Sequence, residues 1–275
     1  MRTITETTLI DFLEGRGEWD GVYEMVECTR ALSPSGLPGL DYALNPYTGC
    51  EHGCIYCYAP GVTHTDLGSW RVVRVKRNIP ERLARELPSV EGVIGLGTVT
   101  DPYQYAERKF RLTQMCLEVL RARGRRVHIH TKSDLILRDI DILGDMDSRV
   151  GVTITNIDDR ISKMTEPGAP LPGARLSALK GLVDAGIDCY ALIAPVMSSL
   201  EGRERELLEA ICDTGVRSVF HDPLNLRNVD PTRLERMGIG QSSVARRRIG
   251  EIGRELGLNV SDSFENRLPD IPPSM

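Results

Sequence analysis

From residue 91 onward the chain alternates short apolar runs with amphipathic stretches of helical period. Such runs are typical of parallel strands buried on both faces, and each intervening helix returns the chain to the start of the next strand. We predict strands at residues 92–98, 126–132, 150–156, 188–196 and 217–224. The helices that follow them are predicted at residues 107–123, 134–144, 173–185, 201–213 and 231–256.

One further unit precedes this series. Residues 41–48 have the pattern of a strand, residues 69–78 that of an extended return segment, and residues 80–88 that of a helix. Strands joined by helices require right-handed crossovers and therefore a parallel sheet. Six such units predict an α/β fold, a partial (βα)6 TIM-like barrel, because a closed barrel of this kind has eight.

The two ends of the chain lack the alternation. Residues 1–40 are predicted to form an N-terminal extension, with an edge strand at residues 22–30. Residues 259–275 show no periodicity and contain three prolines, which predicts a short C-terminal tail or lid. The barrel core is therefore expected to span residues 41–258.

Composition narrows the classes of partner. The formal net charge of −5 at pH 7 provides no overall attraction to DNA or RNA. No apolar run approaches the ~20 residues of a membrane span, and the polar start of the sequence lacks the apolar centre of a signal peptide. The sequence predicts a cytoplasmic protein without a membrane partner.

Three of the seven cysteines lie within eight positions, in the segment NPYTGCEHGCIYCYAP. Cys50, Cys54 and Cys57 follow the first predicted strand, so they are expected at the carboxyl ends of the strands, where βα folds place their ligand sites. Clustered cysteines in a reducing compartment indicate a metal site. The isolated cysteines are predicted to be small buried hydrophobic residues: Cys28, Cys116, Cys189 and Cys212.

Three thiolates leave the fourth metal position open to several interpretations. A structural zinc could take His52 or His64 as its fourth ligand, although such sites usually have paired cysteine knuckles. A closed electron-transfer cluster needs a fourth cysteine, and none lies nearby in the sequence. The third interpretation is a cluster in which one iron is left free for a ligand.

Several segments resemble the radical SAM superfamily, and within it the spore photoproduct lyase-like (DNA repair photolyase-related) branch. They are NPYTGCEHGCIYCYA, GTVTDPYQ, HTKSDLILRDIDIL, GVTITNIDDR, EPGAP and LIAPVM. The resemblance covers about residues 42–224 and implies a [4Fe–4S] cluster held by Cys50, Cys54 and Cys57, with S-adenosyl-L-methionine (SAM) on the fourth iron. Cleavage of SAM would then give a 5′-deoxyadenosyl radical that abstracts hydrogen from a substrate. No residue is assigned a catalytic role from the sequence.

The same resemblance implies a set of SAM contacts. In that family SAM is held by tyrosines flanking the last cysteine, by hydroxyls after the second strand and on the fourth, and by a lysine after the third. The matching residues, with one carboxylate that could accept from the SAM amine, are Tyr56, Tyr58, Thr100, Asp101, Lys132 and Thr153. Structural alternatives are packing for the tyrosines and threonines, a turn for Asp101, and an ion pair with Asp101 or Asp134 for Lys132.

Other polar residues are expected to have structural roles. Arg175 is predicted on a solvated helix face, although it could reach a SAM oxygen. Three histidines are predicted to be satisfied interior residues: His128, His130 and His221. Thr98 stands where the branch has a cysteine that returns hydrogen to the product. Since a threonine O–H bond is too strong for that role, only Cys189 or Cys28 could replace the cysteine.

The resemblance also implies an electron donor, a flavodoxin or a ferredoxin. The negative net charge favours a small molecule or a peptide as substrate over nucleic acid. The alternatives are a nucleic-acid lesion lyase of the spore photoproduct type and, from a different class, a non-enzymatic iron–sulfur electron carrier or a zinc-stabilised binding module.

Overall fold

The computed structural model describes residues 23–226, 229 and 231–263. Its main sheet has the strand order β11-β10-β9-β8-β7-β6-β3-β2, and all neighbours are parallel except β2 and β3. The bounds are β2 Leu32–Pro34, β3 Tyr42–Leu44, β6 Ile94–Leu96, β7 Val127–Thr131, β8 Ser148–Thr153, β9 Asp188–Val196, β10 Ser218–Pro223 and β11 Asn259–Asp262. Within the described residues the sheet stays open, because its edge strands β2 and β11 do not pair. The prediction of an α/β fold with an open, parallel sheet is confirmed.

The six predicted strands are all present, and β11 is a seventh parallel strand that was not predicted. The prediction of a tail from residue 259 is wrong for its first four residues, which pair with β10. Their sequence NVSD contains one apolar residue, Val260, and such a short, polar edge strand gives no period-2 signal. Residues 264–275 of the predicted tail lie outside the described residues.

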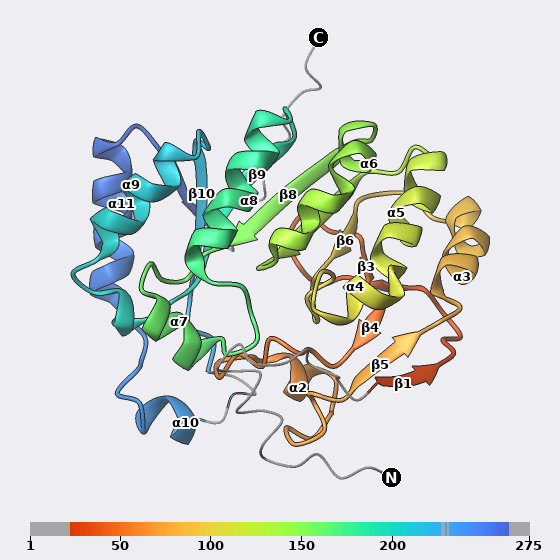
Figure 1. Ribbon diagram of the computed structural model, residues 1–275, viewed down its shortest axis with the longest axis horizontal. Coiled ribbons are helices and arrows are strands. Elements are labelled where there is room, and N and C mark those ends of the chain that lie inside the picture. Colours follow the sequence, from red (N-terminus) through yellow and green to blue (C-terminus); the bar gives the residue numbers. More distant parts are fainter. Residues whose placement is uncertain (1–22, 227–228, 230, 264–275) are drawn as a thin grey trace.

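A second sheet of three strands carries the chain into and out of the cysteine segment. Its order is β1-β5-β4, with β1 Tyr23–Val26, β5 Val73–Lys76 and β4 Tyr47–Thr48. The predicted strand at residues 41–48 is thus divided between β3 in the main sheet and β4 in the small one. The predicted edge strand and return segment correspond to β1 and β5 (Figure 1).

Helices connect the strands. They are α2 Ala59–Val62, α3 Ile79–Glu86, α4 Ala106–Phe110, α5 Leu112–Ala122, α6 Ile140–Gly144, α7 Asp159–Thr165, α8 Pro172–Asp184, α9 Glu204–Asp213, α10 Pro231–Glu235 and α11 Ser243–Glu255. Three 3-10 turns accompany them: η1 Leu87–Ser89, η2 Asp134–Asp139 and η3 Ser198–Leu200. In the part of the chain that the structure describes, none of these helices combines the length and apolarity that crossing a bilayer requires.

Two predicted helices are interrupted, for local reasons. The helix expected at residues 107–123 divides into α4 and α5 at Arg111, whose φ of 52° is left-handed. The helix expected at residues 231–256 divides into α10 and α11 because Gly238 turns with φ 65°. Ser242 then caps α11 by accepting a 2.9 Å hydrogen bond from the Ala245 N–H.

Helix α7 was not predicted, although its cap is visible in the sequence. Asp158 precedes it and its side chain accepts hydrogen bonds from the N–H groups of Arg160 and Ile161. An aspartate at this position is a common helix start. The helix lies before the EPGAP segment, at the carboxyl end of β8.

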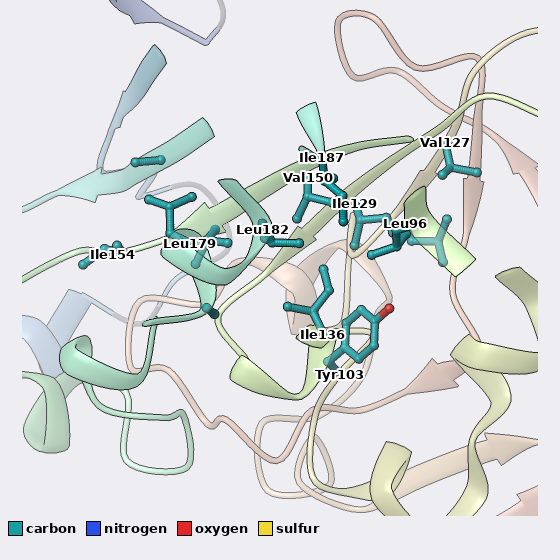
Figure 2. Close-up of a cluster of buried hydrophobic side chains, with 14 of the residues drawn as sticks. Leu96, Tyr103, Val127, Ile129, Ile136, Val150, Ile154, Leu179, Leu182 and Ile187 are labelled. Atoms are coloured by element: carbon teal, nitrogen blue, oxygen red, sulfur yellow. The ribbon is translucent and has the colours of Figure 1, made fainter. Parts of the chain in front are cut away.

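One face of the main sheet packs against helices. Figure 2 shows strand residues such as Ile129 and Val150 beside Leu179 and Leu182 of α8. Successive side chains of a strand point to opposite faces, so the residues between these apolar positions face the opposite, inner side of the curved sheet. On β7 those alternate residues are His128 and His130.

Candidate functional site

The cysteine loop lies between β4 and α2, at the carboxyl end of the main sheet, as predicted. In Figure 1 this orange segment, α2 and α10 lie along the lower edge, beyond the arrowhead of β8. The Cys50 N–H donates a 3.0 Å hydrogen bond to the Trp70 carbonyl oxygen, and the Ile55 N–H donates a 2.9 Å bond to Thr165. The loop is therefore fixed on one side by the segment after α2 and on the other by α7.

Gly49 has the backbone conformation that the start of this loop requires. Its φ is +90°, and a Cβ at this position would stand 2.5 Å from the Val72 carbonyl oxygen. Any other residue would therefore be strained and would also push the loop away from the returning segment.

Glu51, inside the cysteine motif, anchors the loop to α4. Its carboxylate accepts from the Tyr23 hydroxyl at 2.9 Å and from the Ala106 N–H at 2.6 Å. Its own N–H donates to the side chain of Gln104 at 2.9 Å. Glu51 and Gln104 are both buried, so these bonds form away from water and hold the loop rigidly.

The three clustered thiols are free and lie among apolar side chains. Cys50 is buried, whereas Cys54 and Cys57 are partly exposed. Burial raises the pKa of all three thiols, that of Cys54 to about 12. They therefore need a cation such as iron to become thiolates at neutral pH.

Among the described residues, no three His, Cys, Asp or Glu side chains converge closely enough to hold a single metal ion. Thiolates that each bind a different iron of a cluster need not converge on one point. His52 is buried, and its Nδ1 lies 3.5 Å from the Asp101 carboxylate. His64, the other predicted zinc ligand, has a left-handed φ of 52° after α2.

The two tyrosines of the loop differ in exposure. Tyr56 is buried, and its hydroxyl donates to the Glu166 carboxylate. Tyr58 is 37% exposed, and its hydroxyl donates a 3.0 Å hydrogen bond to the Thr98 carbonyl oxygen. Tyr58 therefore presents a fixed, accessible ring at the mouth of the sheet.

The two predicted hydroxyl contacts are both buried. Thr100 is 2% exposed and its hydroxyl donates to the Tyr47 carbonyl oxygen at 3.3 Å. Thr153, 4% exposed, ends β8, and its carbonyl oxygen accepts from Arg175 at 3.3 Å. The structure does not test the SAM contacts predicted for these residues.

Asp101 ties the loop after β6 to the end of β7. Its carboxylate accepts from the Tyr103 N–H at 2.9 Å, the Thr131 hydroxyl at 2.7 Å and the Lys132 N–H at 2.7 Å. These three bonds engage most of its acceptor capacity. Asp101 thus has the turn-forming role named as the alternative, and its contact with the SAM amine stays a prediction.

Lys132 has no ion-pair partner within 4.0 Å in the described part of the chain, so the alternative of an ion pair with Asp101 or Asp134 is wrong. Its Nζ lies 5.7 Å from the centre of the Tyr56 ring. Burial by itself would lower the pKa of this lysine, but the negative charges of Cys54, once it is ionised, and of Glu166 raise it above its usual value. A charged, unpaired ammonium therefore lies beside the cysteine loop.

A buried ion pair that was not predicted lies behind Tyr56. Arg175 Nη2 lies 2.5 Å from Glu166 Oε2, and both side chains are at most 1% exposed. The prediction that Arg175 occupies a solvated helix face is wrong, because α8 turns this residue toward the sheet end. Its Nε also donates to the Pro170 carbonyl oxygen at 2.6 Å. The EPGAP motif marked Glu166, but no local pattern indicated its partner.

A family model described as the radical SAM superfamily matches residues 44–198, more than half of the chain. The chain belongs to the radical SAM superfamily. It is therefore an enzyme of radical SAM chemistry, which overturns the alternatives of an electron carrier and a zinc-stabilised module. Enzymes of this superfamily use SAM and a [4Fe–4S] cluster.

Two relatives support this membership at the level of sequence. An uncharacterized protein of Methanocaldococcus jannaschii is 36% identical over 180 residues, which are 64% of this chain and 68% of the relative. An uncharacterized protein of Mycobacterium tuberculosis is 33% identical over 230 residues, which are 76% of this chain and 67% of the relative.

Solved structures of radical SAM enzymes share the fold. Spore photoproduct lyase complexed with dinucleoside spore photoproduct has a TM-score of 0.68 at 17% identity, covering 95% of this chain and 87% of that one. Streptococcus suis SuiB bound to precursor peptide SuiA has a TM-score of 0.57 at 13% identity, covering 82% of this chain and 49% of that one. At these identities the likeness extends to the fold alone.

The inner side of the sheet in this radical SAM enzyme carries a polar pair. His130 Nε2 lies 2.5 Å from the Tyr190 hydroxyl, which confirms His130 as a satisfied interior residue. Burial and the charge of Lys132 lower the pKa of His130 to about 4, so it is neutral at pH 7. His128 is buried too, but its Nδ1 lacks a hydrogen-bond partner among the described residues. His221 lies on β10, as the strand prediction implied.

Proposed function

We propose that Cys50, Cys54 and Cys57 hold a [4Fe–4S] cluster and that the mouth of the sheet beside them binds SAM. When bound, these groups supply a 5′-deoxyadenosyl radical that abstracts hydrogen from the substrate. The cysteine loop contributes three thiols in an apolar setting that Glu51 holds rigidly to α4. Such a setting excludes water from a reactive site.

The observation that carries the proposal is the unpaired ammonium of Lys132 beside Cys54. A lysine in a partly buried position is costly unless an anion neutralises it. The SAM carboxylate is such an anion, and the Tyr58 ring next to the loop could stack on the adenine. The remaining predicted contacts are Tyr56, Thr100, Asp101 and Thr153. The hydrogen bond to Glu166 fixes the position of the Tyr56 side chain.

Replacing Lys132 with alanine is expected to weaken SAM binding by ~2–3 kcal/mol, the scale of a charge-assisted hydrogen bond in a desolvated site. Equilibrium binding of SAM to the reconstituted protein measures the change. Lys163→Ala is the matched control, because Lys163 is exposed on α7 and is not among the predicted SAM contacts. An unchanged dissociation constant for Lys132→Ala would remove the lysine from the SAM site.

For the substrate we propose a small molecule or a peptide. The net charge of −5 disfavours nucleic acid, and a protein of the same fold, SuiB, is known with a bound precursor peptide. The second candidate is a nucleic-acid lesion lyase, because spore photoproduct lyase with its lesion also has this fold. The two candidate functions differ in the residue that they require at the position of the hydrogen donor.

That position is occupied by Thr98, which donates to and accepts from Asn45 at 3.4 and 3.1 Å. The possible substitutes pack in the apolar core instead. Cys189 and Cys28 both pack against the main hydrophobic core, which lies between strands and helices. No cysteine outside the motif is thus placed to return hydrogen to a product radical on the inner side, within the described residues.

We therefore expect that the enzyme cleaves SAM but does not efficiently repair the spore photoproduct. The reduced enzyme and SAM are incubated with a dinucleotide spore photoproduct, and restored thymidylyl-thymidine is quantified beside 5′-deoxyadenosine. Multiple turnovers of repair that disappear in Cys189→Ala or Cys28→Ala would contradict the proposal and make that cysteine the hydrogen donor. The electron donor is proposed to be a flavodoxin or a ferredoxin.

A further inference from the structure

A small hollow of about 50 Å³ opens beside the cysteine loop. Its walls contain two cysteines of the motif, Cys54 and Cys57, and two arginines, Arg71 and Arg233. The other lining residues are Gly53, Ile55, Pro60, Leu67 and Trp70. None of the six predicted SAM contacts lies among them, so the hollow reaches the thiols from a different side than the proposed SAM site.

The two arginines bring uncompensated positive charge to this place. In the described part of the chain neither has an ion-pair partner, whereas Arg74 and Arg77, just beyond on β5 and after it, pair with Glu24 and Glu27 at 3.3 and 2.5 Å. Arg71 and Arg233 line the same hollow, and burial and the neighbouring charge of Arg233 lower the pKa of Arg71.

Two further features fit an anionic partner. The indole N–H of Trp70 is buried without a hydrogen-bond acceptor among the described residues. The Arg71 guanidinium lies against Gly53, inside the cysteine motif, where no Cβ blocks its approach. Two guanidinium groups and the Trp70 side chain thus line the same hollow on a chain whose net charge is −5.

Arg233 is held in place by the segment that follows β10. In this segment Leu234 and Ile239 are buried in a cluster with Ile55 of the cysteine loop. Arg233 itself is exposed on α10, one residue before Leu234. Packing of the segment on the loop therefore sets the distance from Arg233 to the thiols.

We propose that the hollow with Arg71 and Arg233 is the docking surface for an acidic one-electron carrier protein. The inference rests on the proposed function, since the cluster must be reduced from outside. The carrier would give one electron to the cluster that the three cysteines would hold, and so it would be oxidised as the cluster is reduced. Cys54 and Cys57, the partly exposed thiols of the motif, line the hollow. Electrostatic complementarity chiefly raises the rate of such encounters, which are often small and transient.

The test uses the reconstituted enzyme with two reductants, photoreduced flavodoxin and sodium dithionite. With Arg233→Glu we expect kcat/KM for flavodoxin to fall at least about tenfold, because attraction becomes repulsion. Production of 5′-deoxyadenosine with dithionite should change less than about twofold. Arg236→Glu is the matched control, since Arg236 is exposed three residues further on and does not line the hollow. It should leave both rates unchanged.

A binding measurement provides a readout that does not depend on turnover. The dissociation constant of flavodoxin from the iron-free protein, measured by calorimetry at low salt, should rise by a similar factor in Arg233→Glu and less in Arg233→Ala. Raising the ionic strength should weaken wild-type binding and shrink the difference between variants.

Several outcomes would overturn the proposal. An unchanged kcat/KM for flavodoxin in Arg233→Glu would exclude the hollow as the docking surface. An equal loss of 5′-deoxyadenosine production with dithionite would mean that the arginine maintains the cluster. Loss of substrate turnover with dithionite, at normal SAM cleavage, would assign the hollow to an anionic substrate. Failure of the proposed function is distinct, because the wild type would then not cleave SAM with dithionite.

Discussion

Replacing any one of Cys50, Cys54 and Cys57 with alanine is expected to abolish SAM cleavage. Each thiol would bind one iron, and Cys50 is buried away from water that could take its place. After anaerobic reconstitution the wild type should carry about four irons per chain. Iron content and 5′-deoxyadenosine, measured with dithionite as reductant, should both fall sharply in each variant.

The isolated cysteines provide the controls. Cys116 and Cys212 lie on α5 and α9, where Cys116 is fully buried and Cys212 packs against the same core. Alanine at either position should leave the iron content and SAM cleavage intact, with at most a loss of stability. Full activity in any one of the three loop variants would contradict the assignment of the cluster ligands.

Replacing Arg175 with methionine is expected to lower the free energy of unfolding by ~3–5 kcal/mol. Removing one partner of a buried ion pair leaves the other charge without compensation. Burial alone would raise the pKa of Glu166, but Arg175 and Lys132 lower it to about 2, so the carboxylate is charged at pH 7. Denaturant unfolding of the iron-free protein at pH 7 measures the loss.

The same helix provides a matched control. Lys180 and Asp184 of α8 form an ion pair at 3.1 Å, but their side chains are 58% and 60% exposed. Lys180→Ala should change the stability by no more than about 0.5 kcal/mol, because water screens exposed pairs. Combining Arg175→Met with Glu166→Leu should recover part of the loss, since neither charge of the pair is then left buried without its partner. A loss in Arg175→Met no larger than in Lys180→Ala would show that Glu166 is neutralised in another way.

Strand positions were predictable because periodicity is a local property. The buried runs at residues 126–132 and 188–196 contain β7 and β9 with few errors at their ends. The predicted helices were wrong where a single residue changes the backbone conformation. Arg111 and Gly238 have a left-handed φ that interrupts an otherwise helical pattern. Strand β11 was not predicted because it is short and polar, and an edge strand needs little apolar character.

The cysteine spacing, together with its position after the first strand, indicated the superfamily and the end of the sheet at which the site lies. The sequence by itself also indicated Lys132 at the end of a buried strand. These features are set by residues that are close together in the chain, so the sequence shows them directly. The SAM contacts at the other predicted positions stay predictions.

Tertiary structure alone decided which charges meet. Glu166 binds Tyr56 across 110 positions of the chain, and it meets Arg175 because α8 packs over the end of β8. Arg71 and Arg233 come together because the segment after β10 folds onto the cysteine loop. Whether a charge is buried, paired or left facing a hollow depends on distant segments brought into contact by packing, and no local period in the sequence records that contact.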